Sequence, residues 1–239
     1  MTDPSKTKNP ASEVIWSGTA LHIIKAAAKI IQDDGLSKAT MRNIASSAEV
    51  QPPQIYSHIG DRDKLLETVA IYLWAEHHSA TILGEDPVTD FHHAIDKFIY
   101  FGLIHSELYL YVSRPRQGAG SRLWSHQSDF LRFHLNRIAK ARRLRGSVSQ
   151  AVDFLLPFCI GTTITCMNAL SQPSDVSWLV MKAVQPLIVR DKNHPIESQE
   201  GMKASALAAA LATSIYEVKN FTLGEKLLFK ELLTRLASS

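Results

Sequence analysis

The 239-residue sequence contains few cysteines and no long apolar run. No stretch of 18 or more apolar residues appears, and the first fifteen residues lack the apolar segment of a secretory signal. We therefore expect no membrane span and a cytoplasmic location. Cys159 and Cys166 are the only thiols, and on one helix they would lie about 10 Å apart, too far for a disulfide within the chain. We expect both to be reduced and packed rather than to serve as a sensor.

The motifs of the common enzyme classes are absent as well. The sequence has no His-Glu-x-x-His, no Gly-x-Ser-x-Gly, no phosphate-binding glycine loop and no Cys-x-x-Cys. Its 10 histidines include adjacent pairs at 77–78 and 92–93, and adjacent side chains on a helix point about 100° apart, a poor geometry for a shared metal. We expect no enzyme, no cofactor and no metal site.

Neither strand-like alternation nor an internal repeat occurs, and the 45% apolar composition is ample for a buried core. These features predict an all-α protein. The net charge is only +3, and the first 70 residues carry eight basic and eight acidic side chains. Any affinity of this region for nucleic acid must therefore come from the local placement of a few cations and backbone groups, with a modest salt dependence.

Residues 36–67 have the pattern of two short helices joined by a tight turn. Thr40 is a good N-cap, and the apolar residues that follow it recur at helical spacing to position 48. Glu49 and Val50 interrupt that helix. Gln51-Pro52-Pro53 then begins a second helix, which runs to roughly residue 58, because proline is tolerated in a first helical turn.

The flanking segments complete a small three-helix head. An apolar stripe over residues 20–31 ends at Gly35, which predicts a helix upstream. Gly60 suits the end of the second short helix, and Asp61 suits the N-cap of a long connecting helix that ends near Gly84. Ile55 and Ile59 lie four residues apart and can both face the core.

This region resembles the TetR family of transcriptional repressors across roughly residues 17–68. The pattern is carried by AAAKIIQDDGLSKATMRNIASSAEV and by QIYSHIGDRDKLL. Three residues depart from it: Glu49 stands where the family usually has a turn glycine, Ile59 where an aromatic is common, and Arg62 where a lysine is usual. Glu49 is the departure that fits the pattern least, because a left-handed turn conformation is uncommon for a residue with a Cβ.

The resemblance implies binding to double-stranded DNA through both short helices. Arg42, Pro52, Pro53 and Gln54 would face bases, and Thr40, Tyr56, His58 and Arg62 would face phosphates, with Gln51, Ser57 and Lys64 completing the candidate site. Structural alternatives stay open for three of these side chains. Tyr56 could cover the small core, Arg42 could be a solvated helix residue, and His58 could be structural.

Beyond the head, apolar spacing predicts further helices from 86 to 102, 106 to 113 and 123 to 140, and one from 147 to 170 that Pro157 perturbs. Proline and glycine at 114–122 predict a loop, and 190–201 is polar. Basic residues at 140–145 suit a solvated helix end or an additional contact. Two helices close the chain, and the leucine stripe of the last one, at 228, 232 and 236, would pack either between subunits or inside the core.

The resemblance also implies a domain organisation: a disordered tail at 1–15, the helix-turn-helix DNA-binding domain at 16–64, and a helical effector-binding and dimerisation domain at 65–239. A homodimer would bind an inverted-repeat operator and be released by a small, apolar or aromatic effector. Candidate effector-binding residues are the large apolar side chains Phe98, Phe101, Trp124, Phe158 and Met167, for which core packing is the alternative. Rival functions are a DNA-silent interaction scaffold and a helical enzyme.

Overall fold

The computed structural model describes residues 16, 18–79, 83–114, 120–168, 179–180, 182–189, 207–208, 210–217 and 221–237. Within these residues the regular structure is helical, apart from one isolated β-bridge between Leu144 and Ile188. The predicted all-α class is therefore confirmed. The predicted tail at 1–15 and the polar segment at 190–201 lie outside the described residues, as does most of the predicted loop at 114–122.

The chain forms two compact units, one of residues 1–81 with 97–130 and the other of residues 82–96 with 131–239. The division runs through the two helices α5 (Pro87–Ile104) and α7 (Arg122–Lys140). Each unit is described by itself below, and the boundary that the sequence suggests at residues 64 and 65 stays a prediction.

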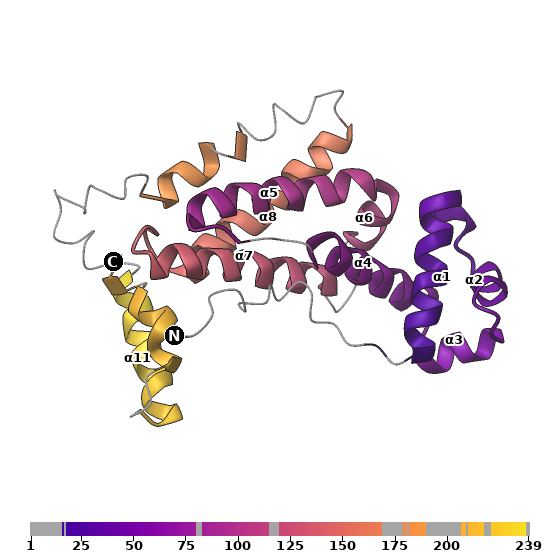
Figure 1. Ribbon diagram of the computed structural model, residues 1–239, viewed down its shortest axis with the longest axis horizontal. Coiled ribbons are helices and arrows are strands. Elements are labelled where there is room, and N and C mark those ends of the chain that lie inside the picture. The colour runs from indigo at the N-terminus through magenta and orange to yellow at the C-terminus, as the bar shows by residue number, and fades with distance from the viewer. Residues whose placement is uncertain are drawn as a thin grey trace. The chain divides into compact units, whose positions relative to one another are not determined.

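The first unit begins with a small helical head (Figure 1). It contains α1 (Gly18–Asp34), the short 3-10 helix η3 (Leu36–Lys38), α2 (Met41–Ser47) and α3 (Pro52–His58). Residues from α1, α2, α3 and the connections between them form a core of nearly zero exposure: Ile23, Ile24, Ala27, Ala39, Ile44, Ala45, Ala48 and Ile55. The predicted N-cap of α2 is present, since Thr40 Oγ1 accepts a hydrogen bond from Asn43 N–H at 3.2 Å.

The turn between α2 and α3 has a left-handed residue where the sequence carries glutamate. Glu49 has φ 50°. The N–H of Val50 donates to Ala45 O at 3.0 Å and that of Glu49 to Ser46 O at 3.3 Å, which is the pair of bonds of a Schellman helix end. That ending requires φ > 0 at residue 49, so a side chain occupies a conformation that glycine adopts without cost.

The connecting helix α4 (Arg62–Ser79) begins at the predicted N-cap, where Asp61 Oδ1 accepts from Lys64 N–H at 2.8 Å. The sequence predicted a single apolar stripe along this helix, but the buried surface of the helix is wider than one stripe. Most of the helix from Leu65 to Ala75 is buried, because neighbouring helices cover several of its sides. The Trp74 ring meets three phenylalanine rings at centroid distances of 5.1–5.4 Å: Phe98, Phe101 and Phe130.

The described part of α4 ends at Ser79, and residues 80–82, just before the predicted end near Gly84, lie outside the described residues. Gly84 belongs to the start of α5. Its N–H donates to both carboxylate oxygens of Asp90, at 2.9 and 3.0 Å, and its carbonyl accepts from Arg137 at 3.0 Å. The apolar face predicted for α5 is confirmed, and Phe91 and Ile95 on it are fully buried.

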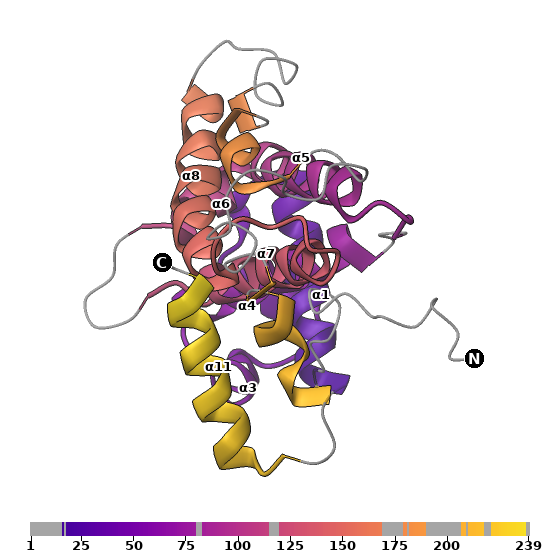
Figure 2. The same cartoon turned by 90° about the vertical axis from the view of Figure 1, so that its left-hand side faces the viewer.

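The remaining helices follow the predicted order, and Figure 2 gives a clear view of α8 and α11 in the second unit. Their bounds are α6 (Ser106–Val112), α8 (Val148–Asn168), the 3-10 helices η4 (Gln185–Leu187) and η5 (Ile215–Glu217), and α11 (Leu223–Ala237). Trp124, which was expected on the buried stripe of α7, is partly exposed, because the buried face at that end is centred on Leu123 and Gln127.

Three of the basic residues at the end of α7 and after it are exposed, as predicted for a solvated helix end, namely Lys140, Arg142 and Arg145, but Arg143 is buried. Arg143 is only 8% exposed. Its guanidinium pairs with Asp86 Oδ1 at 2.5 Å and donates to Val189 O at 2.9 Å. Burial opposes the charge of Asp86, but hydrogen bonds from Thr89 and the charge of Arg143 hold its pKa below the usual value. This cation therefore ties together three segments of the second unit.

Helix α8 runs without interruption through Pro157 and carries both cysteines, which are free. Cys159 is buried, and burial raises the pKa of its thiol to about 12, so the neutral form persists. By length and composition one described helix could cross a membrane, because Val148–Met167 has a mean hydropathy of 1.3 with 39% of that stretch buried. A core helix of a water-soluble protein passes the same test.

The left-handed conformation of Glu49 predicts that glycine is preferred there. Glu49→Gly should raise the free energy of unfolding by up to about 1 kcal/mol, because a residue with a Cβ at φ > 0 is strained by that order. Urea denaturation followed by circular dichroism measures the effect. Glu49→Ala removes the same charge but keeps the strain, so it should bring no gain, and an equal gain from both variants would contradict the account.

Candidate nucleic-acid interface

One buried side chain fixes the orientation of α3. Ile55 has no exposed surface and is the buried residue of this seven-residue helix. Because successive side chains turn by about 100° around a helix, anchoring Ile55 in the head core turns the rest of the helix outward. The exposed residues are Pro52, Pro53, Gln54, Tyr56, Ser57 and His58. Ile59, which was expected to share the core face, is only partly buried.

The start of α3 is held by side chains of the candidate site itself. Gln54 Oε1 accepts from Gln51 N–H at 2.8 Å, and Ser57 Oγ donates to Gln54 O at 3.0 Å. The amide nitrogen of Gln54 makes no hydrogen bond to the described part of the protein, and the side chain is exposed. A two-bond contact from this amide to adenine would therefore have to share or release the Gln51 bond. Its base-facing role stays a prediction.

Helix α2 contributes two further exposed residues. Thr40 uses its hydroxyl oxygen as the N-cap acceptor, which leaves the O–H hydrogen able to donate elsewhere. Arg42, in the first turn of α2, is exposed.

Tyr56 is 56% exposed, so it is not a buried residue of the small core. His58 is exposed at the end of α3.

Arg62 is the candidate residue with the most contacts inside the protein. Its Nε donates to Ala39 O at 3.4 Å, and one terminal nitrogen donates to Tyr111 Oη at 3.2 Å. The guanidinium carbon also lies 5.3 Å from the centre of the Tyr111 ring. A phosphate contact would compete with these bonds, and the assignment stays a prediction. Lys64, two residues along, is exposed.

Sequence reasoning missed the network between α6 and the head. Tyr111 on α6 donates its hydroxyl to Asp63 Oδ1 at 2.5 Å while accepting from Arg62. The bond to Asp63, together with burial, raises the pKa of Tyr111 above its usual value. Glu107, one turn earlier on α6, accepts from Leu36 N–H at 3.1 Å. These partners lie far apart in the chain, and no local pattern marks them.

The arrangement offers a protruding helix whose outer side combines amide, hydroxyl and imidazole groups with two proline rings. An α-helix fits the major groove of B-DNA, where such groups can meet base edges and phosphates. Among the described residues, no group of three or more His, Cys, Asp and Glu side chains could hold a metal ion. The exposed groups of α3 can form hydrogen bonds and apolar contacts with a partner.

The five candidate effector-binding residues are distributed over both units. Phe98 and Phe101 are at most 1% exposed and pack on Trp74 in the first unit, where Trp124 also lies. Phe158 and Met167 belong to α8 in the second unit, and the Phe158 ring stacks on Phe154 at 6.3 Å. Phe98 and Phe101 thus act as core residues in this structure. As an effector-binding set, the five stay a prediction.

The Tyr111 hydroxyl should contribute measurably to stability. Tyr111→Phe removes a group that bridges Arg62 and Asp63, and we expect a loss of about 0.5–1.5 kcal/mol in the free energy of unfolding. Urea denaturation measures it. Tyr100→Phe is the matched control, because Tyr100 is 54% exposed. If both variants lost the same stability, or neither lost any, the bridge would have no energetic role.

Comparison with known proteins agrees with this geometry. Residues 23–69, which span α1 to the first part of α4, match the family model described as "Bacterial regulatory proteins, tetR family". No curated protein matches the chain. Among solved structures, a TetR-family transcriptional regulator from Haemophilus influenzae is 16% identical, with 72% of this chain and 97% of that chain covered at a TM-score of 0.46. The stretch from Ile23 to Val69, which contains both short helices of the candidate interface, is thus similar in sequence to the N-terminal region of the tetR family of bacterial regulatory proteins.

Proposed function

We propose that the protein is a repressor that binds an inverted-repeat operator as a homodimer and leaves it when a small molecule binds. The observation that carries the proposal is the orientation of α3, whose single buried residue, Ile55, turns the other side chains of the helix toward solvent. Apart from the bonds of Gln54 and Ser57 that hold the helix itself, these side chains are directed away from the core of the head. Such a surface suits a helix that enters a major groove.

The exposed residues divide by chemistry into two roles. Arg42 can present two donors to guanine O6 and N7, Gln54 can address adenine, and the rings of Pro52 and Pro53 offer apolar surface to thymine methyl groups. Thr40, Tyr56, His58, Arg62 and Lys64 would bind phosphates and fix the register, with Gln51 and Ser57 supporting the start and the middle of α3. Because basic and acidic side chains balance over residues 1–70, these local contacts must supply the affinity.

A dimer is proposed because one three-helix head makes too few contacts for tight, specific binding. The last helix supplies an apolar surface for it. Six large apolar residues of α11 are 44–68% exposed: Leu223, Leu227, Leu228, Phe229, Leu232 and Leu236. Of the two alternatives for this leucine stripe, the structure of one chain therefore favours packing between subunits, since apolar patches of this kind mark interaction sites.

An effector pocket is proposed in the interior of the first unit. Its core is aromatic, and the buried polar atoms that have no hydrogen-bond partner among the described residues include Trp74 Nε1 and Gln127 Oε1. Such atoms cost about 1–3 kcal/mol each when left unpaired. A small, mainly apolar molecule with a donor and an acceptor, or a bound water, would satisfy them.

Helix α6 gives that interior a physical link to the head. Tyr109 of α6 is fully buried and accepts from Gln127 at 3.4 Å, while Glu107 and Tyr111 of the same helix bond to head residues. An effector that displaces α6 would therefore disturb both contacts. Release follows only if the effector binds the DNA-free conformation more tightly than the DNA-bound one.

Arg42 tests the DNA-reading role against the rival scaffold function. In a gel shift with the DNA upstream of its own gene, the wild type should give a salt-dependent, sequence-selective band. Arg42→Ala should weaken that complex by about 1–3 kcal/mol and relax one operator position. Lys29→Ala is the control, because it removes an equal charge from an exposed site on α1. A scaffold would show no such band. If the two variants weakened the complex equally, Arg42 would contribute only its positive charge and would not read a base.

The leucine surface of α11 is tested by the double variant Leu228→Glu, Leu232→Glu. It should stay helical but run as a monomer in sedimentation analysis and lose operator binding, because charged groups replace side chains that are 50–56% exposed in one chain. Tyr100→Glu, Ile104→Glu on α5 is the matched control at 47–54% exposure. A dimer that survives the α11 change would place the interface on another face.

A further inference from the structure

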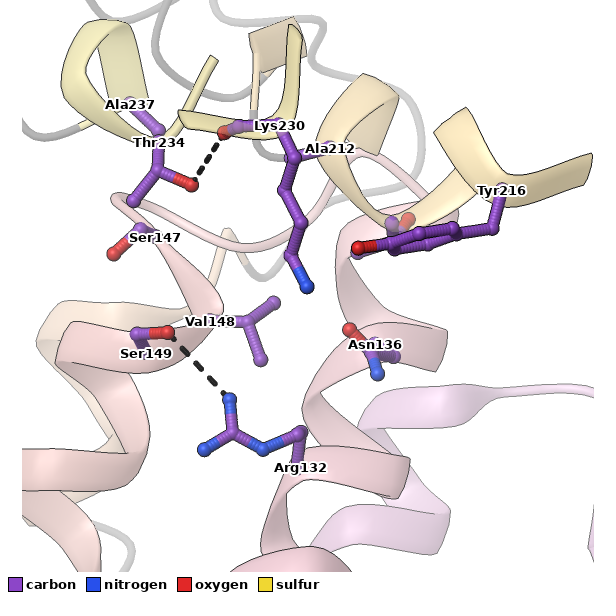
Figure 3. A pocket seen from close by; sticks show the side chains of 11 residues that line it. Arg132, Asn136, Ser147, Val148, Ser149, Ala212, Tyr216, Lys230, Thr234 and Ala237 are labelled. Carbon is purple, nitrogen blue, oxygen red and sulfur yellow. Dashed lines mark hydrogen bonds between the residues drawn. The ribbon is translucent and has the colours of Figure 1, made fainter. Parts of the chain in front are cut away.

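A small cavity lies in the second unit where four segments meet (Figure 3). Helix α7 contributes Arg132 and Asn136, the beginning of α8 contributes residues 147–149, the segment 212–216 forms a third wall, and α11 contributes Lys230. The volume is about 140 Å³, below the roughly 300 Å³ at which pockets for drug-sized ligands begin. The cavity can therefore take only a small molecule.

The charges around this cavity are of one sign. Arg132 and Lys230 are its two ionisable basic residues, and no aspartate or glutamate lines it. Figure 3 shows both side chains extending into the same space from opposite walls. Across the described residues, no ion pair is formed by either cation. Two converging cations without a carboxylate repel each other, and an anion between them would remove that repulsion.

The neutral part of the lining can complete such a site. Ser149 Oγ accepts from Arg132 at 3.5 Å, a weak bond that leaves the guanidinium free to turn to a better acceptor. The cavity also borders the first turn of α8, a 21-residue helix with no acidic residue there, and the N-terminus of a helix favours negative charge. The ring of Tyr216 forms an apolar wall, with Lys230 Nζ 5.1 Å from its centre.

We propose that this cavity binds a small organic carboxylate. Its carboxylate would lie between Arg132 and Lys230, and its short apolar body would rest on Val148 and the Tyr216 ring. Arginine suits the charged end, because its planar fork matches two carboxylate oxygens. The apolar wall favours an organic acid over a bare inorganic ion. This site is separate from the interior of the first unit, and the inference does not rest on the proposed function.

Occupation would have a structural consequence for α11. Most side chains of that helix are exposed, and a small buried pair, Ala208 and Ala237 with Leu233 beside it, is its core contact in the described residues. An anion shared by Lys230 of α11 and Arg132 of α7 adds a bridge to this sparse contact. Binding should therefore protect α11 from local unfolding.

The test uses the full-length protein without DNA, so that its failure leaves the proposed function untouched. Benzoate serves as the organic carboxylate, benzamide as its neutral counterpart and inorganic phosphate as the simple anion. Calorimetric titration at low ionic strength should show saturable benzoate binding at millimolar concentration or below, with no binding of benzamide. Hydrogen exchange should slow in α11 when benzoate is bound.

Two variants locate the binding. Lys230→Gln changes an exposed residue of α11 and should keep the fold, and Arg132→Lys keeps the charge but loses the planar fork. Each should weaken benzoate binding by about tenfold or more, whereas Arg235→Gln, another cation of α11, should not. Absence of benzoate binding, equal binding by all variants, or phosphate binding as tight as benzoate would each overturn the proposal.

Discussion

The burial of Ile55 is the interaction on which the account of the head depends. This side chain fills the space among α1, α2 and α3, and a helix of seven residues has one narrow face to bury. Once that face is fixed, the rotation of α3 is fixed, and the amide, hydroxyl and proline groups on its other sides must meet solvent or DNA. The left-handed turn at Glu49 also constrains α3, because it ends α2 and reverses the chain within the four residues that connect the two helices.

The contacts of α6 extend this constraint beyond the head. Helix α6 bonds to Leu36 N–H through Glu107 and to the start of α4 through Tyr111. In the proposed function, these bonds would let a change in the interior of the first unit reach the candidate DNA-binding residues. Tyr111 of α6 also accepts a hydrogen bond from Arg62, which holds the Arg62 side chain against the protein. In the proposed function, the guanidinium would exchange its partners inside the protein, Ala39 O and Tyr111 Oη, for a phosphate of the DNA, and this competition would couple the effector to the operator.

The parts of the head that the sequence predicted well are those set by interactions between residues close together in the chain. Thr40, the twin prolines and Asp61 act on backbone groups within three residues, so caps and helix starts were predicted closely. Contacts across 49 and 57 residues, from Arg62 to Tyr111 and from Arg143 to Asp86, leave no local trace and were missed. Large apolar residues were ambiguous because a core and an effector pocket need the same side chains, and the cavity at Arg132 is lined by residue types that form no motif.

The central claim is that two outward-facing α3 helices read DNA together. Selection of bound duplexes from a random pool at physiological salt tests it most directly. The account predicts enrichment of one half-site in two inverted copies, with centres about 34 Å or somewhat more apart, and loss of one conserved position when the selection is repeated with an Arg42 variant. A pool that shows no enrichment, or enriches a sequence without two-fold symmetry, would contradict the account.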